Sequence, residues 1–264
     1  MTAASSSRPV PVHAATPPVS AMTWMSVFGR LLAIQGSWNY ETLLGNGVGF
    51  ALEPALRRLP GGVHGDAFKA AMARESAYFN AHPYLTSVAV GALARAELSG
   101  VPPERIERFR TALCGPLGSV GDRLIWAGWL PFSSLVALVA FGFGAAPMTV
   151  VLLFLGLYNA GHFGVRVWGL YVGWKYGLGV ASALANPVLR QGPAYIARAA
   201  AAVAGVAIPL AASRILGFRG PLFIGALACG AVIAVGLVRL HGRVEGWKLV
   251  LVLIALFALV SVAR

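Results

Sequence analysis

The sequence contains few charged residues for its length. Asp, Glu, Lys and Arg make up 11% of its 264 residues, less than half of the roughly 25% that is typical of soluble globular chains. A soluble domain with so little charge could not cover its surface with polar groups. Because 58% of the residues are apolar and the mean hydropathy is +0.73, the composition predicts an integral membrane protein.

Cysteines and catalytic motifs are also scarce. Cys114 and Cys229 lie far apart, with no second Cys or His beside either, which gives no disulfide framework and no predicted metal site. The sequence lacks a GxSxG elbow, an HExxH pair and a Walker loop, and its nine acidic residues form no obvious acid–base pair. We therefore expect no catalytic residues and no cofactor in this chain.

Acidic residues are outnumbered by basic ones, 9 against 21, which gives a net charge of +12. In a soluble protein this excess would suggest a nucleic-acid partner, but no recognisable nucleic-acid-binding fold accompanies it. Cytoplasmic loops of membrane proteins carry an excess of Lys and Arg. The charge therefore favours a protein in contact with the lipid bilayer over a nucleic-acid-binding protein.

The chain divides into three predicted regions. Residues 1–22 are rich in Ser, Ala and Pro and lack an apolar core of signal-peptide length, so we expect a disordered cytoplasmic tail. Residues 23–123 are apolar but interrupted by charges, which favours amphipathic, interfacial and re-entrant helices over full crossings. Residues 124–264 are predicted to form a transmembrane helical bundle.

Several features set the expected helix boundaries in the middle region. The glycines of Gly45–Gly49 predict a break in an interfacial helix. Asp66 is a candidate cap for a helix that runs to about His82, where the next residue is a proline. Residues 83–98 are apolar but short, so a re-entrant segment and a span are equally favoured. A basic helix is expected to begin at about Pro103.

The longest uncharged stretch is Leu124–Val165. At 1.5 Å per residue it would form about 63 Å of helix, enough to cross a core of roughly 30 Å twice, with a turn at residues 142–147. With the basic loop at residues 239–248 inside, we predict an all-α, polytopic fold of about five crossings and a cytoplasmic N-terminus. The other three predicted crossings are Ala199–Ser213, Pro221–Val238 and Leu249–Ala263.

Four polar clusters interrupt this apolar background: QGSWNYE at residues 35–41, FNAHPYL at 79–85, GPLGSVGD at 115–122 and YNAGHFGVR at 158–166. Polar groups at membrane depth are costly unless they are paired, so such clusters mark pathways or interfaces. For each single residue a simpler explanation stays open. Asn159 or His162 would only bond a neighbouring helix, and Asp122 would only pair with Arg123 or cap a helix.

The segment GNGVG at residues 45–49 imitates part of a dinucleotide-binding fingerprint. No strand precedes it and no alternating strand–helix pattern follows, which argues against nucleotide binding. Its glycines favour a helix break or the close approach of another backbone.

The four clusters resemble, in order, the blocks of the IID component of the mannose/fructose/sorbose family of the phosphoenolpyruvate:sugar phosphotransferase system (PTS). The resemblance covers about residues 24–180. The residues that carry it are Gln35–Glu41, Phe79–Leu85, Gly115–Leu117 with Gly121–Asp122, and Tyr158–Asn159 with His162, Arg166, Gly169 and Gly173.

The resemblance implies a membrane subunit of a hexose-type sugar permease in the bacterial inner membrane. In this family a IID chain pairs with a IIC chain, and three such pairs assemble. Separate cytoplasmic IIA and IIB proteins pass phosphate to the incoming sugar, and the IID chain itself is not phosphorylated.

Two departures keep an alternative open. Many family members have Asp-Pro where this chain has Asp122-Arg123, and the stretch after Val180 is shorter than usual. A structural or regulatory membrane partner that has lost sugar transport would explain both. A self-sufficient channel or transporter is a second alternative, and it would move solute without a partner.

The same clusters supply the candidate site residues. Trp38 would offer its ring to a sugar or to a partner helix, and the glycines after it would let the backbone turn. The residues predicted to contact substrate or a partner subunit are Gln35, Trp38, Asn39, Glu41, His82, Asp122, Asn159, His162 and Arg166, and the predicted backbone-turn residues are Gly45, Gly47 and Gly49.

Overall fold

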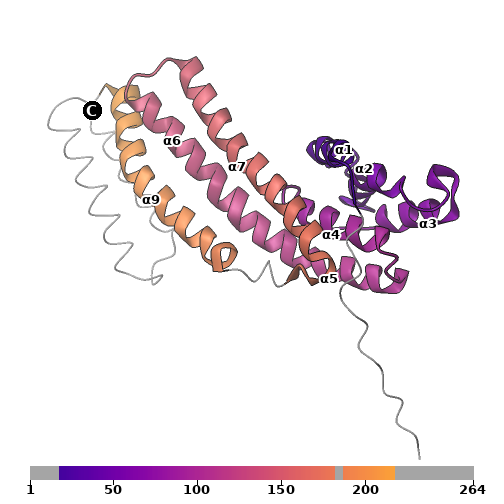
Figure 1. Cartoon of the computed structure of the whole chain (residues 1–264). Coiled ribbons are helices and arrows are strands. Elements are labelled where there is room, and N and C mark those ends of the chain that lie inside the picture. Colours follow the sequence, from indigo (N-terminus) through magenta and orange to yellow (C-terminus); the bar gives the residue numbers. More distant parts are fainter. Residues whose placement is uncertain (1–17, 182–186, 218–264) are drawn as a thin grey trace, which may run out of the picture. The chain divides into compact units, whose positions relative to one another are not determined.

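The computed structural model describes residues 18–181 and 187–217, and within them every regular element is a helix (Figure 1). The predicted all-α fold is therefore confirmed. Most of the predicted N-terminal tail and the predicted crossings at 221–238 and 249–263 lie outside the described residues. The elements are α1 (Ala21–Leu32), α2 (Gly45–Leu56), the 3₁₀ turn η1 (Gly62–His64), α3 (Asp66–Glu75), α4 (Thr86–Leu98), α5 (Pro103–Gly121), the π-helix η2 (Asp122–Trp129), α6 (Leu130–Gly142), α7 (Pro147–Tyr176), the 3₁₀ turn η3 (Gly177–Gly179) and α9 (Pro187–Leu216).

Among the described residues, three continuous helical segments are long and apolar enough to cross a membrane. They are Pro103–Gly142, Pro147–Gly179 and Leu189–Ile215, of 40, 33 and 27 residues, against the roughly 20 residues that a crossing needs. The turn predicted between the first two is present, with Gly144 in the left-handed region at φ +94°. The third helix is longer than the stretch 199–213 predicted from the sequence.

The described chain forms two compact units. The first contains residues 18–129, 158–181 and 187–193, and the second contains residues 130–157 and 194–217. In the second unit α6 and α9 lie side by side (Figure 1), because Gly142 leaves room for Leu210. All four polar clusters fall in the first unit.

Helix α4 forms the centre of the first unit, where 11 of its 13 residues are buried. Its 13 residues span about 20 Å, too little to cross the hydrocarbon core. Of the two alternatives for residues 83–98, the structure therefore favours the short segment enclosed by protein. Its four alanines and single glycine suit this position, since small side chains let neighbouring helices approach closely.

Helices α4 and α7 touch through glycines. A Cβ on Gly173 would lie 2.1 Å from Val88 O, and one on Gly91 would lie 2.4 Å from Leu170 O. A Cβ on Gly169 would lie 2.2 Å from Ser87 Oγ. The pair Gly169 and Gly173 therefore forms a GxxxG contact, in which bare backbones replace side-chain interdigitation.

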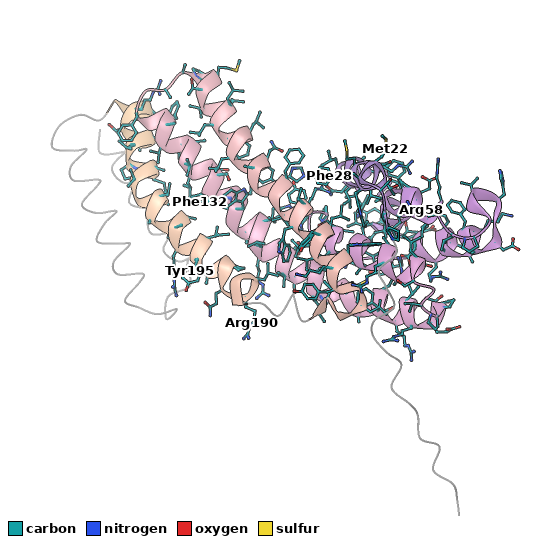
Figure 2. All side chains as sticks on the ribbon, in the orientation of Figure 1. Met22, Phe28, Arg58, Phe132, Arg190 and Tyr195 are labelled. Atoms are coloured by element: carbon teal, nitrogen blue, oxygen red, sulfur yellow. The ribbon has the colours of Figure 1, made fainter. Side chains whose placement is uncertain are left out.

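Helix α1 exposes apolar side chains as well as burying them. Val27 and Leu31 lie in the core, whereas Met22 and Met25 are 78% and 74% exposed, and Figure 2 shows Met22 on the outside of the helix. A helix that is apolar on both faces suits a membrane interface or a second protein surface.

The predicted boundaries of α3 and α2 need correction. Helix α3 ends at Glu75 rather than near His82, because the chain turns to bury Phe79, whose N–H and C=O bond to Thr42 O and Leu44 N. The predicted break at Gly45–Gly49 is also wrong, since α2 begins at Gly45. The break lies one block earlier, in the QGSWNYE segment itself.

Arginines from distant segments satisfy the carbonyls at four helix C-termini. These carbonyls lack partners within their own helix and carry partial negative charge. The pairs are Arg166 with Leu31 O of α1, Arg110 with Glu75 O and Ala77 O after α3, Arg95 with Trp174 O of α7, and Arg214 with Phe141 O of α6.

Candidate functional site

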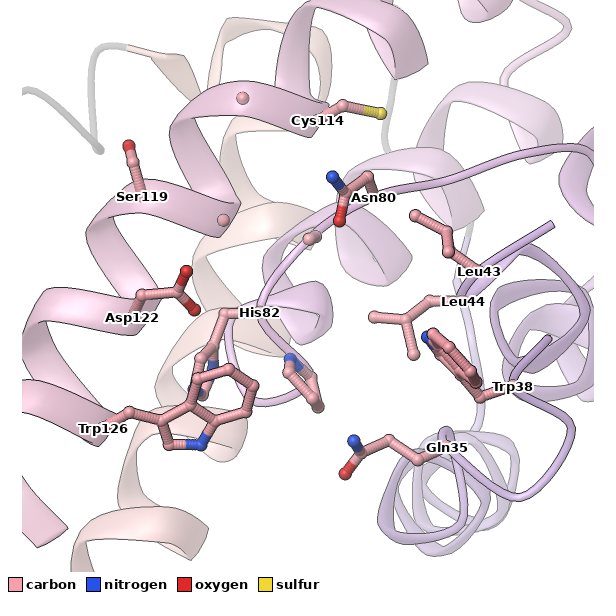
Figure 3. A pocket seen from close by; sticks show the side chains of 14 residues that line it. Gln35, Trp38, Leu43, Leu44, Asn80, His82, Cys114, Ser119, Asp122 and Trp126 are labelled. Carbon is pink, nitrogen blue, oxygen red and sulfur yellow. The ribbon is translucent and has the colours of Figure 1, made fainter. Parts of the chain in front are cut away.

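A pocket of about 360 Å³, with a mixed polar and apolar lining, lies in the first unit. Figure 3 shows Trp126 and Asp122 on one side of it and Trp38 and Leu44 on the other, with Gln35 at the bottom of the view. Three of the four polar clusters converge here. The lining residues are Gln35, Trp38, Leu43, Leu44, Asn80, Ala81, His82, Pro83, Cys114, Gly115, Gly118, Ser119, Asp122 and Trp126.

The first cluster supplies one wall as an irregular loop after α1. Asn39 holds this loop in shape, because its Oδ1 accepts the N–H groups of Glu41 and Thr42, both at 2.9 Å. Leu43, which follows, has φ +49° and is the one non-glycine residue with positive φ among the described residues. Such strain costs about 1–2 kcal/mol and tends to occur at functional sites.

The glycines after this loop let α2 pack against other backbones. A Cβ on Gly45 would lie 2.1 Å from Ala77 O, and one on Gly47 would lie 1.9 Å from Ile34 O. On Gly49 it would lie 2.1 Å from Ser76 Oγ. The three residues predicted to turn the backbone are therefore contact residues inside α2, and this contact holds the loop beside the second cluster.

His82 lies at the back of the pocket and is 1% exposed. Gly121 leaves the space for its ring, and its ring centroid lies 4.8 Å from that of Trp126. The backbone N–H of Tyr84 donates to His82 Nδ1 at 3.2 Å, which places the proton of the neutral ring on Nε2. Burial, together with the charge of Arg166, lowers the pKa of His82 to about 4. Within the described residues, Nε2 is buried without a hydrogen-bond partner.

The third cluster reaches the pocket where α5 gives way to the π-helix η2. Asp122 is the first residue of η2, and Trp126 follows it on the same helix. π-Helical segments are rare and occur frequently at functional sites. On the preceding turns Gly115, Gly118 and Ser119 present a smooth, weakly polar surface to the pocket.

The fourth cluster does not line the pocket but supports it from α7. Arg166 is 2% exposed, and its Nε donates to His162 Nε2 at 2.9 Å. His162 Nδ1 then faces Asn159 Oδ1 at 3.3 Å. The Arg166 guanidinium lies over the Tyr84 ring at 4.8 Å, and the Tyr84 hydroxyl bonds to that of Tyr158 at 2.8 Å. Tyr84 is also the residue whose backbone N–H fixes the His82 tautomer, so this network is connected to His82 in the pocket wall.

The structure therefore separates the nine predicted contact residues into groups. Gln35, Trp38, His82 and Asp122 meet in one pocket. The other five are elsewhere: Asn39 shapes the loop, Glu41 is exposed, and Asn159, His162 and Arg166 form the network on α7.

Sequence reasoning missed Asn80, Ser119 and Trp126 as lining residues. Asn80 and Ser119 lie inside two of the four polar clusters, so the neighbouring polar residues indicated their position. Trp126 lies four residues after Asp122, a spacing that places two side chains on one helix face. In the part of the chain that the structure describes, no group of three or more His, Cys, Asp or Glu could hold a metal ion.

Comparisons with known proteins agree on one family. Residues 18–211 match the family described as PTS system mannose/fructose/sorbose family IID component. Over 171 residues the chain is 29% identical to the PTS system mannose-specific EIID component of Escherichia coli (strain K12), covering 62% of this chain and 59% of that relative. It is 30% identical over 169 residues to the fructose permease IID component of Bacillus subtilis (strain 168), covering 61% and 59%. The matched region thus spans about three fifths of these relatives' own length.

Two solved structures share the fold. One is the cryo-EM structure of the mannose transporter ManYZ in complex with microcin E492, at 25% identity and a TM-score of 0.55, covering 73% of this chain and 71% of that one. The other is described as the structure of a membrane protein, at 26% identity and a TM-score of 0.62, covering 70% and 69%. The family match spans well over half of the chain, and the matched residues include all four clusters. This helical membrane protein belongs to the IID component family of the mannose/fructose/sorbose PTS.

Proposed function

We propose that this chain is the IID membrane subunit of a sugar permease, and that the pocket between the first three clusters contacts a hexose-type sugar. The observation that carries the proposal is the convergence of Gln35, Trp38, His82 and Asp122 on one pocket of about 360 Å³, a volume at the lower end of small-molecule sites. No catalytic residue is assigned to the chain.

The pocket chemistry suits a sugar. A sugar ring has hydroxyls that donate and accept hydrogen bonds and carbon faces that pack on aromatic rings. The Asp122 carboxylate would accept, and Gln35 and Asn80 would do both. Trp38 and Trp126 lie on opposite sides of the pocket (Figure 3), and each would offer an aromatic surface to the sugar ring.

One departure from the family pattern leaves this chemistry intact. Arg123 follows Asp122 directly, and an ion pair between them would have withdrawn the carboxylate from the pocket. The Arg123 side chain instead donates from Nε to Ser119 O at 3.1 Å and is exposed. Asp122 therefore stays available, which favours a transport subunit over a regulatory partner that has lost transport.

The loop that carries Trp38 also fits a subunit contact. Tyr40 is 88% exposed, and its ring centroid lies 4.9 Å from that of Trp38. Exposed aromatic pairs are typical of the centres of protein interfaces. We propose that this loop meets a IIC subunit in the bacterial inner membrane, in a trimer of IIC–IID pairs served by cytoplasmic IIA and IIB proteins. The N-terminus would lie on the cytoplasmic side.

The test is sugar binding and uptake by the chain co-purified with a candidate IIC chain. Alanine at Gln35 or Asp122 should weaken sugar binding about 5- to 150-fold, since each removes a polar contact worth about 1–3 kcal/mol. Asp66→Ala is the matched control, because its carboxylate is fully exposed on α3 and lies outside the pocket. Pocket variants that assemble with IIC and transport as well as Asp66→Ala would refute the proposal. Uptake by the chain without IIC would favour a self-sufficient transporter.

A further inference from the structure

We propose that the C-terminal end of α7 binds the headgroup of an anionic phospholipid, with Lys175 contacting the phosphate and with Tyr171 and Tyr176 holding the Lys175 side chain. The inference goes beyond the proposed function and does not depend on it, because it requires only that this chain lies in a bilayer. The ligand class is a diacyl lipid with a net negative headgroup, which the site would prefer to a zwitterionic lipid.

The length and the exposed face of α7 place its C-terminal end at the level of the lipid headgroups. The helical segment Pro147–Gly179 has 33 residues, which is about 50 Å, or roughly 20 Å more than the hydrocarbon core. Two apolar side chains, an amphipathic ring and a cation are the contacts that a helix makes in turn as it leaves the hydrocarbon. One exposed face of α7 has this order at every fourth residue, in Phe163, Val167, Tyr171 and Lys175.

Two tyrosine rings hold the Lys175 side chain. Its Nζ lies 5.7 Å from the centroid of the Tyr171 ring and 5.5 Å from that of the Tyr176 ring, and both distances are within the range of a cation–π contact. The two tyrosines are 61% and 46% exposed, so the ammonium group stays at the protein surface, where a lipid can reach it. Ordering a flexible Lys side chain before the ligand arrives lowers the entropic cost of binding.

The sequence around Lys175 provides no counter-charge. Residues 123–244 contain nine Lys or Arg residues and no Asp or Glu. Within the described residues Lys175 makes no ion pair. Glu97 of the neighbouring helix α4 is bound by Arg74 through both carboxylate oxygens. An anionic headgroup would supply the counter-charge, since each Lys near an anionic lipid surface strengthens binding about fivefold.

The end of α7 does not itself repel an anion. The last carbonyls of a helix carry partial negative charge, which would oppose a phosphate. Here the Arg95 guanidinium donates to Trp174 O at 3.2 Å and to Lys175 O. The Lys175 ammonium is therefore not needed to stabilise its own helix end.

The apolar part of the same face offers a surface to an acyl chain. Phe163 and Val167 are 41% and 56% exposed, and beside them Gly164 has no described atom within 4 Å of an added Cβ. From Phe163 to Lys175 the helix rises about 18 Å, slightly more than half of the roughly 30 Å core. The face therefore spans one leaflet, with Lys175 at its polar edge.

The test is native mass spectrometry of the full chain, alone and co-purified with a candidate IIC chain, titrated with palmitoyl-oleoyl phosphatidylglycerol or the matching phosphatidylcholine. The wild type should bind phosphatidylglycerol at least about fivefold more tightly than phosphatidylcholine. Lys175→Gln should remove most of this preference, and Lys175→Arg should keep it. Tyr171→Leu keeps an apolar side chain but removes the ring contact with Lys175, so it should weaken phosphatidylglycerol binding about two- to fivefold.

Two controls accompany these variants. Lys69→Gln removes the same charge from an exposed lysine on α3 that already has a counter-ion in Asp66, so the lipid preference should be unchanged. Glycerol 3-phosphate carries the headgroup phosphate without acyl chains, so it should not displace phosphatidylglycerol at equal concentration.

Four results would overturn the lipid site. The first is an equal preference in the wild type and in Lys175→Gln, and the second is an equal loss in Lys69→Gln, which would reflect net charge alone. Displacement by glycerol 3-phosphate would indicate a site for soluble phosphates, and a preference that disappears when IIC binds would assign this face to the subunit contact. Lys175, Tyr171 and Tyr176 do not line the pocket described above, so each of these results would leave the proposed function standing.

Discussion

Replacing Gly173 with Ala tests the close contact between α4 and α7. The added Cβ would lie 2.1 Å from Val88 O and 2.8 Å from Ala92 N, whereas an ordinary carbon–oxygen contact is more than 3 Å. Both obstacles are backbone atoms of a buried helix, so neither can rotate away. The helices must separate by about 1 Å, and overpacking of this kind typically costs about 1–3 kcal/mol.

Gly164→Ala is the matched control on the same helix. Gly164 has nothing within 4 Å of an added Cβ. Both substitutions gain the same helix propensity, about 0.8–1 kcal/mol in favour of Ala. The difference in unfolding free energy between the two variants therefore isolates the contact, at about 1–3 kcal/mol.

The assay is thermal unfolding of the purified protein in one detergent, followed by tryptophan fluorescence. Gly173→Ala should unfold several degrees below Gly164→Ala, and Gly91→Ala should behave like Gly173→Ala because its Cβ would lie 2.4 Å from Leu170 O. Equal unfolding temperatures for Gly173→Ala and Gly164→Ala would refute the close packing of α4 on α7.

Three other side chains give independent predictions. Burial raises the pKa of Glu75 to about 8 although Arg110 opposes the shift. The folded state therefore holds a proton that the unfolded state releases, and stability falls as pH rises from about 4.5 to 8. In unfolding scans across this range Glu75→Gln should lose less stability than the wild type, and parallel curves would contradict the assignment. The pH dependence of stability has the opposite sign for His82, since its lowered pKa makes stability fall as pH drops from about 6.5 to 4. His82→Asn should lose less stability over this range, and an unchanged loss would count against a buried neutral imidazole. Arg166→Lys keeps the charge, but a Lys side chain cannot bond both Leu31 O and His162 while covering the Tyr84 ring. The loss of one charged hydrogen bond should lower the unfolding free energy by about 2 kcal/mol, which a lower unfolding temperature would show.

Much of the helical layout could be predicted from the sequence because it depends on local composition. The uncharged run Leu124–Val165 and the turn after Gly142 required only hydropathy and chain length. The end of α3 could not be predicted in this way. It depends on burial of Phe79 beside the loop at residues 35–44 and on Arg110, which reaches the α3 carbonyls from the next helix but one.

The candidate site shows the same division. The sequence marked Gln35, His82 and Asp122 as polar groups that an apolar background must satisfy, but it could not tell which of the nine candidates face a common space. Trp126 lay outside every cluster, and the π-helix that presents it has no sequence signature comparable to an α-helical period.

The sequence by itself determined that this is a helical membrane protein with four polar blocks that resemble those of the PTS IID family. The tertiary structure decided what each block does, because a glycine or an arginine looks the same in a sequence whether it turns the chain, admits a neighbour or caps a helix. Gly45 and Gly47 let neighbouring backbone pack closely against α2, and Gly49 leaves space for Ser76. Arg166 supports the site by bonding Leu31 O. Only the packing of α2, α5 and α7 around residues 79–85 brings three separate blocks to one pocket.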